Sequence, residues 1–362
     1  MPEIIIIGGG AIGMLTAREL HRAGADSLLL DRGPLGGESS WAGGGIISPL
    51  YPWRYDDSVN RLAELSKCLY PDIVGQLHDE SGVDCELINS GLLVTDTDET
   101  AQALEWARDW SIEMQLIDNA GEIHKIEPAT SSELDAGLWM PDIMQIRNPK
   151  LVKALKGSLS SLGIDFREHT PALQLVTESG SIRGVITSTE TLYADKVIVT
   201  SGAWTAGLIT AVQAPAVEPV KGQMIMFRGE TGLIRRMVLS LDHYIIPRRD
   251  GRVLAGSTLE RTGFDKSTTD NAKVELKNAA VQIIPALDGC AIERHWAGLR
   301  PGTANGIPYI CEHPEISGLF INAGHFRNGI VLGAASSRLM AELVIGKATS
   351  LDPSPYSMDA LH

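Results

Sequence analysis

The sequence predicts a mixed α/β fold in which a parallel sheet covered by helices is interleaved with an antiparallel sheet. A run of β-branched residues leads directly into a glycine-rich turn and a helical pattern, as parallel strands with crossover helices do. Other β-forming runs flank short glycine-containing turns, which is typical of hairpins. The 362 residues exceed the roughly 250–300 that one core supports, so we expect two domains.

The first strand is predicted where Ile4 to Ile7 form a run of β-branched residues. Gly8, Gly10 and Gly13 follow in the spacing G-x-G-x-x-G, and the segment "AIGMLTARELHRAG" has helical periodicity with a glycine stop. A turn of this kind lets backbone N–H groups and a helix N-terminus approach a pyrophosphate. The pattern therefore indicates a Rossmann-like unit.

An acidic residue supports this interpretation. The second strand, "SLLL", ends in Asp31, which follows Gly10 by about the 20 residues at which a carboxylate accepts hydrogen bonds from an adenosine ribose. The strands, helix and carboxylate in register favour dinucleotide binding over an ordinary glycine turn. A carboxylate here disfavours the 2′-phosphate of NADP, so we expect FAD or NAD.

A Gly- and Ser-rich segment from Gly33 to Pro49 bears on the choice between these cofactors. Such composition is usually a flexible loop. Its place after the ribose-binding strand would let Ser39 and Ser40 meet phosphate oxygens, while the glycines at 43–45 pass close to a flat ring. NAD enzymes have no such need here, so the extended loop favours FAD.

Two later segments are expected to return to the cofactor. The strand Val197 to Thr200 runs into Ser201 and Gly202. The strand Leu319 to Asn322 precedes a glycine-bounded turn at 324–329 and a long apolar helix. The partial positive charge of that helix N-terminus would stabilise an anion on a flavin ring.

The antiparallel sheet is predicted from turn signals. Asp-Gly at 250–251 and Asn-Ser-Gly at 89–91 each lie between β-rich runs, which predicts two hairpins. Residues 101–111 and 273–284 have helical patterns. The sequence has no internal repeat or low-complexity tract, so we expect two interleaved domains without a hinge-like linker.

Composition excludes several function classes. A net charge of −14 and a pI near 5.1 argue against a nucleic-acid partner. No apolar run reaches the 18–20 residues needed to cross a membrane. The scattered Cys68, Cys85, Cys290 and Cys311 indicate neither disulfides nor a metal site, and they fit a reducing cytoplasm.

The stretch "WAGLRPGT" places Arg300 among small and apolar residues, with no acidic residue from Trp296 through Ile310. An unpaired buried charge costs several kcal/mol. If the segment is buried, the guanidinium needs an anion from elsewhere. The alternative is an arginine on a surface turn.

Several motifs resemble the FAD-dependent D-amino acid oxidase (DAO) family, and within it the glycine oxidases linked to thiamine biosynthesis. They are "IIIIGGGAIG", "SSWAGGGI", "VKGQ", "HYIIPRRDGR", "HWAGLRPGT" and "AGHFRNGI", in order from about Ile4 to Gly346. The resemblance implies oxidative deamination of glycine, sarcosine and small D-amino acids. The products would be the 2-oxo acid, ammonia or an amine, and hydrogen peroxide, after hydride transfer to flavin N5.

The resemblance also implies site residues. Arg300 would grip the substrate carboxylate bidentately, Tyr244 would reach the same carboxylate, and Arg327 would be a second arginine near the flavin. No catalytic general base is assigned, because His325 fits a structural or cofactor-contacting role better. The expected FAD-binding residues are Gly8, Gly10, Ala11, Ile12, Gly13, Asp31, Arg32, Ser39, Ser40, Gly44, Gly45, Ile46, Ala172, His325, Arg327, Asn328, Gly329, Ile330 and Val331.

Both domains are expected to be discontinuous. The FAD-binding domain would take residues 1–50, 140–215 and 295–362, and the substrate-binding domain 51–139 and 216–294. A homo-oligomer, with a tetramer common among the resembled enzymes, is expected in the cytoplasm. Two alternatives remain open: an amino acid dehydrogenase that passes electrons to a carrier rather than oxygen, and a flavin-binding module without catalysis.

Overall fold

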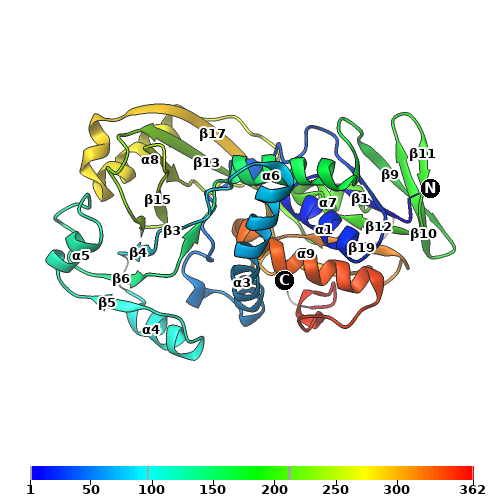
Figure 1. The fold of residues 1–362 in the computed structure, drawn as a ribbon, viewed down its shortest axis with the longest axis horizontal. Coiled ribbons are helices and arrows are strands. Elements are labelled where there is room, and N and C mark those ends of the chain that lie inside the picture. Colours follow the sequence, from blue (N-terminus) through cyan, green and yellow to red (C-terminus); the bar gives the residue numbers. More distant parts are fainter. Residues whose placement is uncertain (1, 96–97, 211–212, 361) are drawn as a thin grey trace.

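The computed structural model describes residues 2–95, 98–210, 213–360 and 362, which form an elongated molecule with a large sheet in each half (Figure 1). One sheet is parallel except at one edge, where β18 runs antiparallel to its neighbour. Its strands are, in spatial order, β18 (Tyr309–Glu312), β19 (Leu319–Ala323), β12 (Lys196–Val199), β1 (Ile4–Ile7), β2 (Ser27–Leu30) and β8 (Asp165–Arg167).

Strand β1 lies at the centre of this sheet, between β12 and β2. Ile4 and Ile6 face a layer of helices, whereas Ile5 and Ile7 face a smaller sheet on the other side. The smaller sheet contains β9 (Ala172–Glu178), β10 (Ser181–Thr187) and β11 (Thr191–Tyr193). A strand covered on both faces must be apolar at every position, which explains the unbroken isoleucine run.

The helix layer contains α1 (Ala11–Arg22), α3 (Asp57–Ser81), α6 (Asn148–Leu162) and α9 (Gly329–Ile345). Helix α9 packs against both α1 and α3 (Figure 1). The fully buried Arg18 of α1 is bonded to Glu80 of α3 and Ser158 of α6, each at 2.6 Å. This ion pair joins three helices within the core.

One helical stretch, Phe326–Ile345, is long and apolar enough by composition to cross a membrane, although the sequence was expected to contain no such segment. In this structure 67% of its apolar window is buried. Its apolar side chains belong to the core beneath the parallel sheet. The helix is therefore apolar because protein surrounds it.

The second sheet has eight strands and is largely antiparallel, with one parallel pairing, between its fifth and sixth strands. In spatial order they are β17 (Ala291–Gly302), β13 (Glu218–Arg228), β16 (Arg252–Gly256), β15 (His243–Pro247), β14 (Met237–Ser240), β4 (Leu92–Val94), β6 (Gly137–Met140) and β5 (Gln115–Ile117). Helix α8 (Asp270–Ile283) covers one face. The other face carries an apolar cluster that includes Met224 and Tyr244.

The hairpin expected at 250–251 is confirmed, because β15 and β16 pair antiparallel on either side of that turn. The hairpin expected at 89–91 is wrong. Strand β3 (Ile88–Asn89) pairs with β7 (Met144–Gln145), while β4 pairs with β6 and β14. Ser90 is bonded to Gln145 and Gly91 has a left-handed φ of 64°, so the chain passes from one sheet to another here.

The Gly- and Ser-rich segment is not wholly extended, since it contains the short helix α2 (Ser39–Ala42). The expected helices at 101–111 and 273–284 correspond to α4 (Thr100–Asp109) and α8. The remaining elements are α5 (Ala120–Ile126), α7 (Thr205–Leu208) and the 3₁₀ turns η1 (Pro52–Arg54), η2 (Gly202–Trp204), η3 (Pro285–Gly289), η4 (Phe326–Asn328) and η5 (Ser354–Tyr356).

The two sheets alternate along the chain. Helix α3 packs with α6 and α9 beside the parallel sheet, and β17 belongs to the eight-stranded sheet while the chain after it returns to β18 and β19. The mixed α/β fold class is therefore confirmed. The domain bounds given above stay a prediction.

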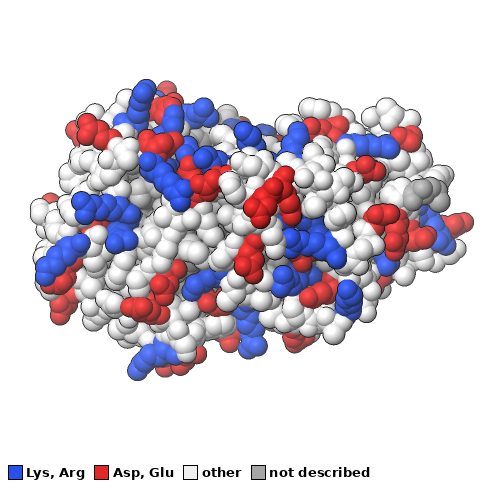
Figure 2. Space-filling view, in the orientation of Figure 1, with Lys and Arg blue, Asp and Glu red and all other residues white. Residues whose placement is uncertain are grey.

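Charged side chains of both signs are interspersed over both halves of the face shown in Figure 2. The sequence carries a net charge of −14. On this face the structure offers no continuous basic surface of the kind that follows a phosphate backbone.

We expect Gly13→Ala to lower the melting temperature clearly. A Cβ at this position would lie 1.9 Å from the Gly8 carbonyl oxygen and 2.7 Å from Thr200 Oγ1, so the turn must shift. Overpacking of this kind costs about 1–3 kcal/mol. Gly75→Ala is the matched control: it lies in α3 with nothing within 4 Å, and alanine is the better helix former. Equal thermal unfolding of both variants would contradict the close packing of the turn.

Candidate active site

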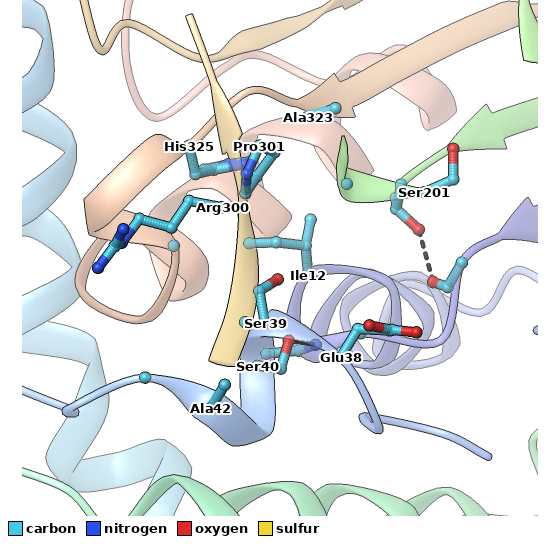
Figure 3. A pocket seen from close by; sticks show the side chains of 18 of the residues that line it. Ile12, Glu38, Ser39, Ser40, Ala42, Ser201, Arg300, Pro301, Ala323 and His325 are labelled. Carbon is cyan, nitrogen blue, oxygen red and sulfur yellow. Dashed lines mark hydrogen bonds between the residues drawn. The ribbon is translucent and has the colours of Figure 1, made fainter. Parts of the chain in front are cut away.

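A single cavity of about 490 Å³ extends from the glycine turn after β1 to the eight-stranded sheet. Figure 3 shows Ser39, Ser40 and Ala42 on one side and Arg300 and His325 on the opposite side. The wall thus combines loops that follow parallel strands with side chains of β13, β15 and β17. Neither sheet encloses the cavity alone.

The glycine turn forms one end of the cavity. Gly8 has a φ of 114°, which favours glycine, and Gly10 precedes the first residue of α1. Asp31 accepts hydrogen bonds from the N–H groups of Gly9 at 2.7 Å and Gly33 at 2.8 Å. Burial raises the pKa of Asp31, whereas these two N–H groups lower it. The carboxylate therefore fixes the turn as well as lining the cavity.

The loop around α2 forms the next part of the wall. Ser40 Oγ accepts a hydrogen bond from the N–H of Ala11 at 2.9 Å, which ties this loop to the start of α1. Gly44 approaches the eight-stranded sheet so closely that a Cβ would lie 2.8 Å from Ile246. Buried Arg248 donates to the Gly44 carbonyl at 2.6 Å and holds the loop there.

The turn between β19 and α9 contributes a buried hydrogen-bond chain. Ser336 Oγ donates to Asn322 Oδ1 at 2.6 Å, so its oxygen accepts from His325 Nε2 at 2.7 Å. This assigns the proton of the neutral imidazole to Nε2. Burial lowers the pKa of His325 to about 3. The imidazole is therefore uncharged near neutral pH and is no cation for the site.

Arg300 lies on β17 at the other end of the cavity, and its hydrogen bonds go to uncharged acceptors. Nη1 donates to the carbonyls of Lys221 and Thr258, each at 3.2 Å, and Nη2 donates to Ser257 Oγ at 2.7 Å. Burial lowers the pKa of Arg300, while the neighbouring Tyr244 raises it. The guanidinium is held in place without a carboxylate bonded to it among the described residues.

Two other predicted substrate residues lie in the same cavity wall. The hydroxyl of Tyr244 donates to the sulfur of Met224 at 3.5 Å, a weak bond that a better acceptor would replace. The charge of Arg327 acts on Arg300, and no hydrogen-bond acceptor or acid pairs with Arg327 in the described part of the chain. The structure thus gathers two arginines and a tyrosine hydroxyl.

All of the predicted site residues line this cavity except one. Gly13 lies behind the wall, where its lack of a side chain leaves room for the Gly8 carbonyl. The residues that line the cavity as predicted are Gly8, Gly10, Ala11, Ile12, Asp31, Arg32, Ser39, Ser40, Gly44, Gly45, Ile46, Ala172, Tyr244, Arg300, His325, Arg327, Asn328, Gly329, Ile330 and Val331. Their individual roles stay predictions.

Several lining residues were missed by the sequence analysis. The guanidinium of Arg32 lies 3.7 Å from the centre of the Trp204 ring, and Phe264 stacks on that ring with centroids 5.4 Å apart. Ser257 and Gly222 lie against Arg300 at the other end. Trp204, Phe264 and Ser257 belong to no periodic or glycine-rich pattern. Gly222 could have been found, because it is the glycine of the motif "VKGQ".

The residues present fit FAD. The start of α1 and the hydroxyls after β2 suit a pyrophosphate, and the loop at Gly44 leaves room for a flat ring. Asn328 is 2% exposed, and its Nδ2 has no hydrogen-bond partner among the described residues. It lines the cavity, so an acceptor on a bound ring system would satisfy it.

Residues 3–343 match the model of a family described as FAD dependent oxidoreductase (DAO). The chain belongs to this family. The curated glycine oxidase of Pseudomonas putida is 42% identical over 358 residues, covering 98% of both chains. The crystal structure of glycine oxidase from Geobacillus kaustophilus superposes with a TM-score of 0.93 at 30% identity, covering 99% of this chain and 98% of that one.

A bifunctional protein ThiO/ThiG from Trichormus variabilis is 28% identical over 95% of this chain and 52% of its own length. With these findings the predicted family, the fold class, FAD as cofactor and the FAD-dependent oxidase class are confirmed. The cavity that runs from the glycine turn to Arg300 is accordingly the candidate flavin site of this oxidoreductase.

We expect His325 to make the fold sensitive to acid. Its folded pKa is about 3, whereas an exposed histidine titrates near 6.5, so the unfolded chain binds the extra proton. The full stability is present above about pH 6.5 and is lost as the pH falls towards 3. Between pH 7.5 and 5.5 the loss attributable to this residue is about 1.4 kcal/mol.

Urea unfolding of the protein and of His325→Gln at these two pH values measures this effect. The neutral glutamine should lose about 1.4 kcal/mol less than histidine over the same interval. An equal loss in both proteins would contradict the burial of an uncharged imidazole.

Proposed function

We propose that this enzyme oxidises glycine, sarcosine and small D-amino acids with FAD as the immediate and O2 as the final electron acceptor. For a primary amine the products are the 2-oxo acid, ammonia and hydrogen peroxide, formed with one O2 and one water. The observation that carries the proposal is Arg300, a guanidinium in the flavin cavity bonded to uncharged acceptors beside the Tyr244 hydroxyl. The glycine oxidase relatives support it.

Arg300 would bind and orient the substrate carboxylate. Three of its five N–H groups are bonded to the carbonyls of Lys221 and Thr258 and to the Ser257 hydroxyl, and Tyr244 also interacts with the guanidinium. The N–H groups that these three acceptors do not use would serve a ligand, together with the Tyr244 hydroxyl. The Tyr244 hydroxyl can turn from the Met224 sulfur to the same carboxylate. Such contacts fix the α-carbon relative to the flavin ring, and positioning of this kind lowers the barrier.

The cavity near Tyr244 is apolar. Ile46, Leu50 and Met224 line it and belong to one buried cluster. This wall suits a small alkyl side chain or an N-methyl group and has no carboxylate to attract a free ammonium group. The proposed substrates share a small, uncharged substituent on the α-carbon or the nitrogen, which such a wall can accommodate.

The site needs no strong base from the protein. The titratable acids that line the cavity, Asp31 and Glu38, belong to the ribose end, and His325 already donates its Nε2 proton to Ser336. The substrate amine would therefore lose its proton to water before or during binding. FAD, when bound, supplies the acceptor for the hydride that leaves the α-carbon, and the imine product hydrolyses in water.

The relationship to a bifunctional ThiO/ThiG protein supports a role in thiamine biosynthesis as part of this proposal. A cytoplasmic location is proposed with it, and the free thiols of Cys68, Cys85, Cys290 and Cys311 are consistent with a reducing compartment. A homo-oligomer, with the tetramer as the expected form, and the absence of nucleic-acid and membrane partners stay predictions.

The visible spectrum of the FAD-loaded protein tests the function. Under anaerobic conditions glycine or sarcosine should bleach the flavin, and air should restore the colour with one hydrogen peroxide per turnover. Restoration only with an added electron carrier would replace the oxidase by an amino acid dehydrogenase. A flavin that no small amino acid bleaches would overturn the proposal.

We expect Arg300→Ala to weaken substrate binding severely while leaving the FAD content near normal. Losing one member of a desolvated charge pair costs about 2–5 kcal/mol, or roughly a 30- to several-thousand-fold rise in KM. Arg294→Ala is the matched control, because Arg294 lies on the same strand but is exposed. Steady-state kinetics with glycine measures both variants. Unchanged KM in Arg300→Ala would rule out the carboxylate clamp.

A further inference from the structure

The position of the Arg300 guanidinium depends on a short segment that follows β16. Ser257 Oγ accepts from Nη2 at 2.7 Å, and the Tyr244 hydroxyl also interacts with this guanidinium. The other acceptors are the backbone carbonyls of Lys221 and Thr258. The orientation of the remaining N–H groups is therefore fixed by residues 257–258 and by β13.

Strand β13 admits the guanidinium because it has a glycine at the point of contact. A Cβ at Gly222 would lie 2.1 Å from Nη2, 2.3 Å from Nη1 and 2.3 Å from Cζ of Arg300. The guanidinium thus lies directly against the backbone of β13. In this narrow space Nη2 bonds to the hydroxyl of Ser257.

The segment that carries Ser257 is in turn attached to β13. The N–H of Glu260 donates to the Lys221 carbonyl at 2.9 Å, and the N–H of Lys221 donates to the Glu260 carbonyl at 2.8 Å. Thr258 Oγ1 accepts from the N–H of Gln223 at 2.9 Å. These bonds continue the pairing of β13 with β16 for a few residues beyond the end of β16.

A buried ion pair strengthens this attachment. The Lys221 side chain is 2% exposed, and its Nζ lies 3.1 Å from Glu260 and 3.0 Å from Asp265. Burial opposes the charge of Lys221, but the hydrogen bonds to Asp265 and Glu260 raise its pKa overall. A cation this far from solvent would be strongly unfavourable without both acids, so the segment is held wherever Lys221 is charged.

We propose that Ser257 is a positioning residue that aims the Arg300 fork at the substrate carboxylate, and that the Lys221–Glu260–Asp265 cluster holds Ser257 in place. The inference rests on the proposed function in one respect, that Arg300 binds a carboxylate. Ser257 lines the cavity but acts through Arg300. Without the hydroxyl, the planar guanidinium as a whole can turn away from the geometry that a bidentate contact requires.

Acetate is the probe that isolates this effect, because it has a carboxylate and no oxidisable amine. Its binding to the FAD-loaded protein is followed by the change in the flavin spectrum. We expect Ser257→Ala to weaken acetate binding about tenfold, the effect of losing one hydrogen bond to a charged group. The second-order rate constant for anaerobic flavin reduction by glycine should fall by a similar factor, with the rate at saturation changed less than about threefold.

Thr262→Ala is the matched control, since Thr262 lies on the same segment but is exposed and belongs neither to the Lys221 cluster nor to the surroundings of Arg300. This variant should bind acetate like the parent. FAD content and thermal unfolding of both variants should equal those of the parent, which excludes a general loss of fold.

A double-mutant cycle separates positioning from a structural role. In an Arg300→Met background, Ser257→Ala should change the second-order rate constant less than about twofold, because the hydroxyl then has nothing to orient. An equal loss in both backgrounds, or unchanged acetate binding in the single variant, would overturn the proposal. If acetate behaves as expected but glycine bleaches neither parent nor variant, the positioning role stands and the proposed function fails.

Discussion

The site depends on the guanidinium of Arg300, which has no carboxylate bonded to it among the described residues. Its acceptors are two carbonyls and a hydroxyl, which supply partial negative charge but no full counter-ion. Burial of such a group is expensive, and burial lowers the pKa of Arg300 as a result. The surrounding structure keeps the charge in position: Gly222 makes room for it, and the segment beginning at Ser257 is tied to β13 by the buried Lys221. The contacts of the eight-stranded sheet thus offset the unfavourable free energy of holding this guanidinium without a counter-ion, and a bound anion would neutralise its charge.

The interleaved chain explains how this charge comes to face a flavin site. Strands β13 and β17 pair over most of their length, and at Gly298 the backbone of β17 is so close to Ala42 that a Cβ there would lie 2.6 Å from its methyl group. Trp296 donates from its indole nitrogen to the Ala42 carbonyl at 3.0 Å. The loop after β2 is therefore fastened to the strand that carries Arg300. A shift of the eight-stranded sheet against the parallel sheet would break these contacts, so the distance between flavin loop and arginine is set by packing.

Local sequence signals were sufficient for the parts of the site that use backbone geometry. The glycines before α1, Asp31 and the hairpin carrying Tyr244 all have short-range patterns, and their positions in the structure agree with them. The hairpin predicted at 89–91 was wrong because the strands on either side of Gly91 belong to different sheets. Each of these strands pairs with a segment far away in the sequence, and a local pattern carries no information on such pairings. Phe264 was missed for a related reason, since its partner Trp204 lies far away in the chain. Residues whose role depends on a contact between distant parts of the chain can be identified only when the fold is known.

Three arginines inside this molecule show why burial alone does not identify a binding residue. Arg18 is paired with the Glu80 carboxylate, so its charge is already neutralised within the core. Arg248 is held by the carbonyls of Gly44 and Ile146 and by Gln145, and burial lowers its pKa to about 10, but its bonds are directed at the loop that it supports. Arg300 resembles Arg248 in having uncharged acceptors, yet it is only half-buried, lines the cavity and keeps N–H groups that Lys221, Thr258 and Ser257 do not use. A cation inside the protein identifies a ligand site when its remaining donors face open space, and Arg300 meets that condition where the flavin and a small carboxylate would be adjacent.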